Sequence, residues 1–215
     1  MLLKTKNLMK AFGGLKAIDK VDFELPAGEI RGIIGPNGSG KSTFFNLVSG
    51  VYDPDPGSYI EFDGHDITDG PPHKIGALGL SRTFQLLRLY QDMSVINNVM
   101  SGYHTRVKYK FFDAVIGRKK IWDQEKEIKD EMMELLSFVG LADYAELNAS
   151  ELSGGQRRLL VLARAIAMKP KLLMLDEPAA GLSPVNVDNL MKIIMQLKDK
   201  YGLTLIIIEH ILKVV

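Results

Sequence analysis

The chain of 215 residues contains no cysteine, which excludes disulfides, thiolate metal sites and a cysteine nucleophile. It also has little net charge, formally +1, so no strongly basic balance favours nucleic acid as a partner. Long hydrophobic runs are missing too: the strongest, residues 203–208, is short and is interrupted by Thr204. A membrane helix needs roughly 20 consecutive apolar residues, and the N-terminus lacks the apolar core of a secretory signal. Any association with a membrane is therefore expected to go through a partner.

What the chain does have is a glycine-rich stretch with a lysine, between an apolar run and a helical pattern. The run Ile30–Ile34, apolar except for Arg31, predicts a strand, and the spacing of the apolar side chains in residues 44–48 predicts a helix. The pattern G-x-x-x-x-G-K-S in this context predicts a cradle for nucleotide phosphates, built from inward-facing amides and the helix N-terminus. The candidate nucleotide-binding residues here are Gly35, Pro36, Asn37, Gly38, Ser39, Gly40, Lys41, Ser42 and Thr43. We expect Lys41 to reach the β- and γ-phosphates and the Ser42 hydroxyl to be a ligand of Mg²⁺.

An acidic pair follows a second apolar run, residues 172–175. A continuous apolar run of this length predicts a parallel strand that is buried on both faces. Ligands bind outside the carboxyl ends of such strands, so Asp176 and Glu177 are expected to face the phosphate cradle. Asp176 would hold Mg²⁺ directly or through water, and Glu177 would orient and deprotonate the attacking water. The alternative is that Asp-Glu-Pro forms an exposed turn.

Two further motifs have a structural and a functional interpretation, and the residues alone leave both open. Phe12, next to a glycine pair, either stacks on a purine base or packs under its turn. Ser153, Gly154, Gly155 and Gln156 begin a predicted helix, and the Ser153–Gln156 spacing is that of a capping box. The same hydroxyl and amides could instead bind a second phosphate group.

Strands that alternate with helices predict an α/β fold with a parallel sheet. The pattern of apolar residues changes after Gln85, and residues 90–150 have helical periodicity. We interpret this stretch as a helical subdomain inserted into the α/β core. The predicted division places 1–85 and 152–215 in the nucleotide-binding core and 86–151 in the helical subdomain.

In order and spacing, residues 35–42, Gln85, 152–156, 175–178 and His210 resemble the ATP-binding subunit of an ABC transporter over the whole chain. The resemblance implies a P-loop NTPase core of the ABC type with N-terminal antiparallel β strands. It implies ATP and Mg²⁺ as ligands, Gln85 as the residue that senses Mg²⁺ and the attacking water, and His210 as a switch histidine contacting the γ-phosphate. It also implies that the Ser153–Gln156 motif acts in trans, in a head-to-tail dimer with a second identical or different ATPase subunit.

A narrower resemblance, to the ATPase subunits of branched-chain amino-acid importers, rests on residues 12–17, 82–85 and 179–184. It implies transmembrane permease subunits as direct partners, a solute-binding protein as an indirect one, and a peripheral position on the cytoplasmic face of the membrane. Urea or amide importers and a lipopolysaccharide-export ATPase share much of this pattern. A soluble ABC module of DNA repair or translation is the alternative from another class, but the chain lacks the long coiled coil or second ATPase domain expected there.

Two departures from the family pattern bear on these expectations. Ser183 stands where many members have Asp, which affects a contact across the dimer. Members continue beyond the switch histidine with a further strand and helices. The resemblance therefore predicts that this chain is truncated after Val215, with an exposed sheet edge and impaired ATPase activity.

Overall fold

The computed structural model describes residues 1–83, 89–103 and 118–209, with only the backbone described for residues 118–124. The chain forms two compact units, one made of residues 1–85 and 170–215 and the other of residues 86–169. The predicted Gln85 and His210 lie outside the described residues.

The first unit begins with an antiparallel sheet, as the resemblance implies. Strands β1 and β2 form a hairpin through the two-residue turn Gly13-Gly14, with Gly13 in the left-handed region at φ +59°. Residues 63–64 form a second tight turn, as Asp-Gly predicts. The sheet has the order β2-β1-β4-β5, with β1 at Leu3–Phe12, β2 at Leu15–Leu25, β4 at Tyr59–Phe62 and β5 at His65–Asp66.

The second sheet of this unit is parallel and has the order β3-β8-β7-β6. Its strands are β3 at Ile30–Ile34, β6 at Leu80–Arg82, β7 at Leu172–Asp176 and β8 at Thr204–Glu209. Every residue of β7 and β8 is buried, which is why both strands appear in the sequence as continuous apolar runs.

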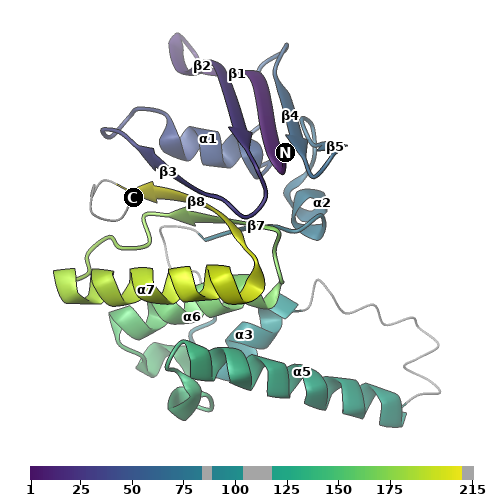
Figure 1. Cartoon of the computed structure of the whole chain (residues 1–215), viewed down its shortest axis with the longest axis vertical. Helices are drawn as coiled ribbons and strands as arrows, with labels where there is room; N and C mark the ends of the chain where they lie inside the picture. The colour runs from purple at the N-terminus through teal and green to yellow at the C-terminus, as the bar shows by residue number, and fades with distance from the viewer. Residues whose placement is uncertain (84–88, 104–117, 210–215) are drawn as a thin grey trace. The chain divides into compact units, whose positions relative to one another are not determined.

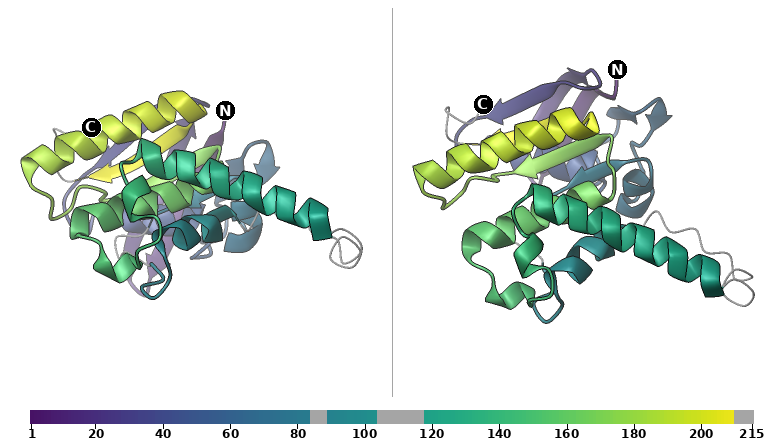
Figure 2. Two further views of the ribbon diagram at one scale, coloured as in Figure 1. Left: turned by 90° about the horizontal axis from the view of Figure 1, so that it is seen from below. Right: turned by 60° about the horizontal axis from the view of Figure 1, so that its bottom comes forward.

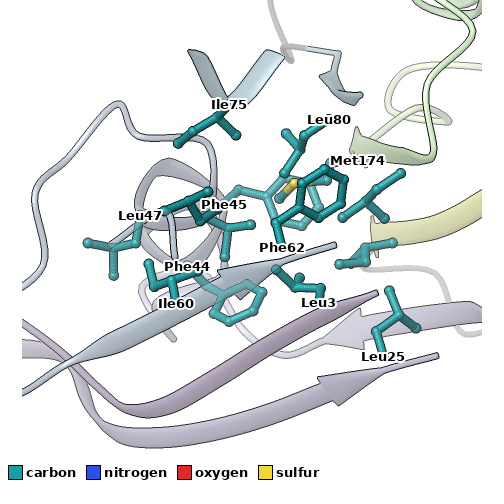
Figure 3. Close-up of a cluster of buried hydrophobic side chains, with 14 of the residues drawn as sticks. Leu3, Leu25, Phe44, Phe45, Leu47, Ile60, Phe62, Ile75, Leu80 and Met174 are labelled. Carbon is teal, nitrogen blue, oxygen red and sulfur yellow. The ribbon is translucent and has the colours of Figure 1, made fainter. Parts of the chain in front are cut away.

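Helix α1, Lys41–Val48, fills the space between the two sheets. Figure 3 shows its side chains Phe44, Phe45 and Leu47 among apolar residues from both sheets, including Leu3, Phe62 and Met174. Burying a side chain of this size stabilises the fold by roughly 1.5–3 kcal/mol. The core of the first unit thus fixes the position of the helix that begins at Lys41.

Two other helices belong to the first unit. Helix α7, Pro184–Tyr201, runs along the parallel sheet beside β8 (Figures 1 and 2). Its apolar stripe, which includes Val187, Leu190 and Ile194, is buried. It ends at Gly202 in the left-handed conformation, a helix terminus that glycine favours. The short helix α2, Pro72–Ala77, contributes Ile75 to the core around α1.

The second unit is helical, as the periodicity of residues 90–150 predicts. Helices α3, α5 and α6 pack on one another, and Figure 2 shows them together. Gly102 allows α3 to approach α6 closely, because a Cβ there would lie 2.2 Å from the Arg164 carbonyl oxygen. The elements are α3 at Val95–Tyr103, α5 at Arg118–Phe138, η2 at Ala142–Tyr144, η3 at Ala149–Glu151 and α6 at Gly154–Ala167.

The division into units differs from the predicted division by one helix. The predicted core resumes at residue 152, whereas the second compact unit extends to residue 169. Helix α6 accounts for the difference, since it packs on α3 and α5. The sequence predicts a helix here but does not indicate which elements it packs against.

Candidate functional site

The glycine-rich loop between β3 and α1 has the geometry of an anion cradle. Gly38 and Gly40 have φ angles of +81° and +90°, and a Cβ at Gly40 would lie 2.4 Å from the carbonyl oxygen of Ala17. Only glycine therefore fits at Gly40. No side chain caps helix α1, so its first amides and the positive end of its dipole remain available for an anion.

Lys41 lies at the first position of this helix, and its side chain turns back toward the loop. Its ammonium donates hydrogen bonds of 2.8 Å to the carbonyl oxygens of Gly35 and Pro36. The residue is buried, with 8% of its surface exposed. A buried ammonium needs such partners, and a phosphate oxygen beside the loop would replace neutral carbonyls with a charged acceptor.

A cavity of about 290 Å³ connects the loop to two other predicted site residues. Phe12 and Glu177 both line it together with residues 37–43. The cavity is also lined by Leu15, Lys16 and Ala17 at the start of β2, which were not predicted as site residues. They belong to the segment 12–17 that carries the narrower resemblance, and they line the cavity because the β1–β2 hairpin brings them beside the loop.

Phe12 does not pack under its turn, which was one of its two predicted roles. The residue is 45% exposed, and its ring meets Tyr52 edge-on at a centroid distance of 5.5 Å. The Lys10 ammonium lies 5.7 Å from the ring centre. An exposed ring at the edge of the cavity offers a face to a planar ligand.

The acidic pair does not form an exposed turn. Asp176 is buried at the end of β7, and its Oδ2 accepts a hydrogen bond of 2.9 Å from Arg82. Glu177 lies in the left-handed region at φ +48°, where an L-residue has a strain of roughly 1–2 kcal/mol. Its N–H donates to the Ile208 carbonyl at 3.0 Å, which holds this conformation beside β8.

The chemistry of the donors fits a magnesium ion shared with nucleotide phosphates. Ser42 lines the cavity, and the bond from Arg82 engages one oxygen of the Asp176 carboxylate, Oδ2. Within the described part of the chain, no three His, Cys, Asp or Glu residues group to hold a metal by themselves. Mg²⁺ is commonly bound by one or two protein oxygens together with substrate phosphates, which agrees with this small donor set.

The predicted Ser153–Gln156 motif lies at the start of helix α6 in the second unit, and it does form a capping box. The Ser153 Oγ accepts from the Gln156 N–H at 3.3 Å, and the Gln156 Oε1 accepts from the Ser153 N–H at 2.9 Å. Ser153 and Gly154 are nevertheless exposed. The structural interpretation is confirmed, and the exposed surface leaves the motif accessible to a ligand.

The fold and the phosphate cradle together define a class of protein, the ATP-binding cassettes. The family model described as ABC transporter matches residues 18–180, and the chain belongs to this family. It is therefore a transporter ATPase that binds and hydrolyses ATP. Within the described residues, no helix is long and apolar enough to cross a membrane.

The chain is similar to two described proteins and to one solved structure. The chain is 42% identical to a probable branched-chain amino acid transport ATP-binding protein of Archaeoglobus fulgidus, over all of this chain and 81% of the relative. It is 38% identical to the high-affinity branched-chain amino acid transport ATP-binding protein LivG of Escherichia coli K12, over all of this chain and 84% of that protein. A crystal structure of the ADP conformation of an ABC transporter cassette has a TM-score of 0.83 at 35% identity, covering 99% of this chain and 82% of the other.

Proposed function

We propose that the chain is the ATP-hydrolysing subunit of an importer for branched-chain amino acids. The observation that carries this proposal is the similarity over the full chain to two proteins described as branched-chain amino acid transport ATP-binding proteins, one archaeal and one bacterial. The ATPase would be peripheral on the cytoplasmic face of the membrane and bound to permease subunits. A solute-binding protein would contact those permeases on the opposite side.

In this proposal the predicted site residues divide the work on ATP. The loop amides and Lys41 bind the phosphates, and the exposed Phe12 ring stacks on the adenine base. Ser42 and Asp176, with Gln85, hold Mg²⁺, which when bound would neutralise charge on the β- and γ-phosphates. Glu177 takes the proton of the attacking water as general base. His210 contacts the γ-phosphate.

The strained Glu177 supports the assignment of the general base. Left-handed non-glycine residues of this kind gather at functional sites, and this residue lines the same cavity as the phosphate loop. Glu177→Gln should bind ATP but lose turnover by about 100-fold or more, since the amide keeps the shape without accepting a proton. Steady-state hydrolysis at the wild-type rate would refute this role.

We also propose that ATP binds between two ATPase subunits arranged head to tail. The exposed Ser153 and Gly154, at the N-terminus of α6, would contact the γ-phosphate held by the partner's loop. Ser153→Arg should leave ATP binding by the monomer unchanged but abolish ATP-driven dimerisation. Dimerisation is measured by light scattering, with Ser153→Arg introduced into protein that also carries Glu177→Gln. If Ser153→Arg removed nucleotide binding by the monomer, the motif would act within its own chain.

The permease contact is proposed for an apolar surface of the second unit. Four large side chains there are exposed, Tyr90 at 56%, Met93 at 38%, Tyr144 at 36% and Leu147 at 40%. Backbone hydrogen bonds hold their segments together, from Val95 N–H to the Leu147 carbonyl at 2.9 Å and from Ala149 N–H to the Met93 carbonyl at 3.0 Å. Such a surface suits the apolar face of a short helix.

Uptake of labelled leucine by proteoliposomes tests the whole assignment. Met93→Glu and Leu147→Glu should reduce uptake while ATP hydrolysis by the isolated subunit is unchanged. Met195→Glu, on helix α7 and 42% exposed, is the matched control and should transport normally. Normal uptake by both variants of the apolar surface would place the permease contact elsewhere. Uptake of another class of solute in place of leucine would refute the assignment of branched-chain amino acids as the substrate.

A further inference from the structure

The guanidinium of Arg82 connects three elements that surround the phosphate site. Arg82 is the last residue of strand β6, and its Nη2 donates a hydrogen bond to Asp176 Oδ2 at the end of β7. Its Nη1 donates to Asn46 Oδ1 at 2.6 Å and to Ser49 Oγ at 3.2 Å. Asn46 lies in helix α1, and Ser49 is the C-cap of that helix. The guanidinium also lies 5.3 Å from the centre of the Phe45 ring.

These contacts span the two elements that supply the proposed Mg²⁺ donors. Helix α1 carries Ser42 in its first turn and Asn46 one turn later, and strand β7 ends in Asp176. Because one rigid, planar fork is bonded to both elements, it fixes the helix relative to the strand. The pair with Asp176 is buried, with 7% and 8% of the two side chains exposed, so water does not compete strongly for either partner.

We propose that Arg82 is a positioning residue for the magnesium site of the bound nucleotide. By holding Oδ2, Arg82 orients the Asp176 carboxylate and directs the other oxygen, Oδ1, to the metal or its water. By holding Asn46 and Ser49, it sets the spacing between the Asp176 carboxylate and the Ser42 hydroxyl. The inference rests on the proposed binding of Mg²⁺ by Ser42 and Asp176.

The general behaviour of metal sites gives the expected size of the effect. Carboxylates that bind metals are themselves held by hydrogen bonds, and losing such a partner typically costs 10–100-fold in metal affinity or activity. A second effect has the opposite sign, since a positive charge beside Asp176 repels Mg²⁺. Arg82→Lys separates the two effects, because lysine keeps the positive charge but cannot bond to both elements with one planar group.

The experiment measures binding of a fluorescent ATP analogue, mant-ATP, at increasing free Mg²⁺. In Arg82→Lys the Mg²⁺ concentration for half-maximal binding should rise by about 10–100-fold, while mant-ATP affinity in EDTA changes by less than about twofold. Arg31→Lys is the matched control, since Arg31 is also paired with a carboxylate, Glu29 at 3.0 Å, and lies near an aromatic ring, Phe23. It should leave both quantities unchanged.

Asn46→Ala keeps the proposal testable if Arg82→Lys does not fold, because it removes one bond of the fork and retains the buried ion pair. Thermal unfolding of each variant establishes that it is folded. Asn46→Ala should raise the half-maximal Mg²⁺ concentration in the same direction as Arg82→Lys, by a smaller factor.

The outcomes separate the inference from the function on which it rests. An unchanged or lower Mg²⁺ requirement in folded Arg82→Lys, or in Asn46→Ala if it alone folds, would overturn the positioning role. If binding by the wild-type protein did not respond to Mg²⁺ at all, the proposed metal site itself would fail.

Discussion

Replacing Asn98 by alanine or aspartate tests how the second unit holds the segment that carries Tyr90 and Met93. Asn98, on helix α3, is fully buried. Its Oδ1 accepts from the Tyr90 N–H at 2.9 Å. Its Nδ2 donates to the carbonyl oxygens of Tyr90, Met93 and Ser94 at 2.9, 3.1 and 3.1 Å. One side chain therefore satisfies four backbone groups of residues 90–94.

The loss in free energy of unfolding depends on whether these backbone groups find other hydrogen-bond partners in each variant. Asn98→Ala removes all four bonds, each with a net value of about 0.5–1.5 kcal/mol, but residues 90–93 are exposed enough for water to replace some partners. We expect Asn98→Ala to lower the free energy of unfolding by about 2–4 kcal/mol. Asn98→Asp has nearly the same shape but turns an oxygen toward three carbonyl oxygens, and a buried carboxylate needs donors. It should therefore destabilise the protein more than alanine does.

Urea denaturation gives the free energies of unfolding, and hydrogen exchange at the Tyr90 amide reports on the segment directly. Protection of that amide should fall in both variants. Asn97→Ala is the control, because Asn97 is the neighbouring residue of the same helix but is exposed, and it should change stability by less than about 0.5 kcal/mol. The reasoning is refuted if Asn98→Asp is as stable as the wild type, or more stable than Asn98→Ala.

Further substitutions test the first unit. Lys41→Ala should weaken ATP binding by about tenfold or more in equilibrium titrations, since a charge-assisted contact is lost; unchanged affinity would contradict the cradle. Gly40→Ala should lower the free energy of unfolding by more than about 1 kcal/mol, because its Cβ would lie 2.4 Å from a backbone oxygen. Gly14→Ala, where a Cβ meets nothing within 4 Å, should leave the free energy of unfolding in urea denaturation nearly unchanged. Glu209→Leu should destabilise by about 1–3 kcal/mol, because the buried Glu209 Oε1 accepts from the Ala179 N–H at 2.8 Å, whereas Glu209→Gln keeps an acceptor and should recover most of this loss.

Much of the fold could be predicted because its strands and helices carry strong local signals. The buried strands β7 and β8 are continuous apolar runs, and the phosphate loop requires glycine at positions of positive φ. The Asp-Gly pair at 63–64 marks the turn between β4 and β5. These signals act within a few residues of the chain, so the sequence alone contains them.

The contacts that complete the site could not be predicted, because they join distant residues without a pattern. Arg82 and Asp176 are 94 positions apart, and a single arginine in a strand has many possible partners. Leu15 and Lys16 reach the cavity through the fold of the β1–β2 hairpin, and their place in the segment 12–17 does not by itself predict that position. The packing of α6 on α3 depends on Gly102, a residue that in the sequence is one glycine among 20.

Ser153 shows why a structural and a functional interpretation of one motif need not exclude each other. The capping box uses a lone pair of the Ser153 hydroxyl and the carbonyl of the Gln156 side chain. The hydroxyl hydrogen and the amides of Gly154 and Gly155 are not used by this box, and Gly154 is exposed. A serine cap begins the helix with these amides directed outward, and the dipole of α6 adds positive potential at the same point. The cap therefore prepares the helix N-terminus for the phosphate that the proposed partner subunit would bring.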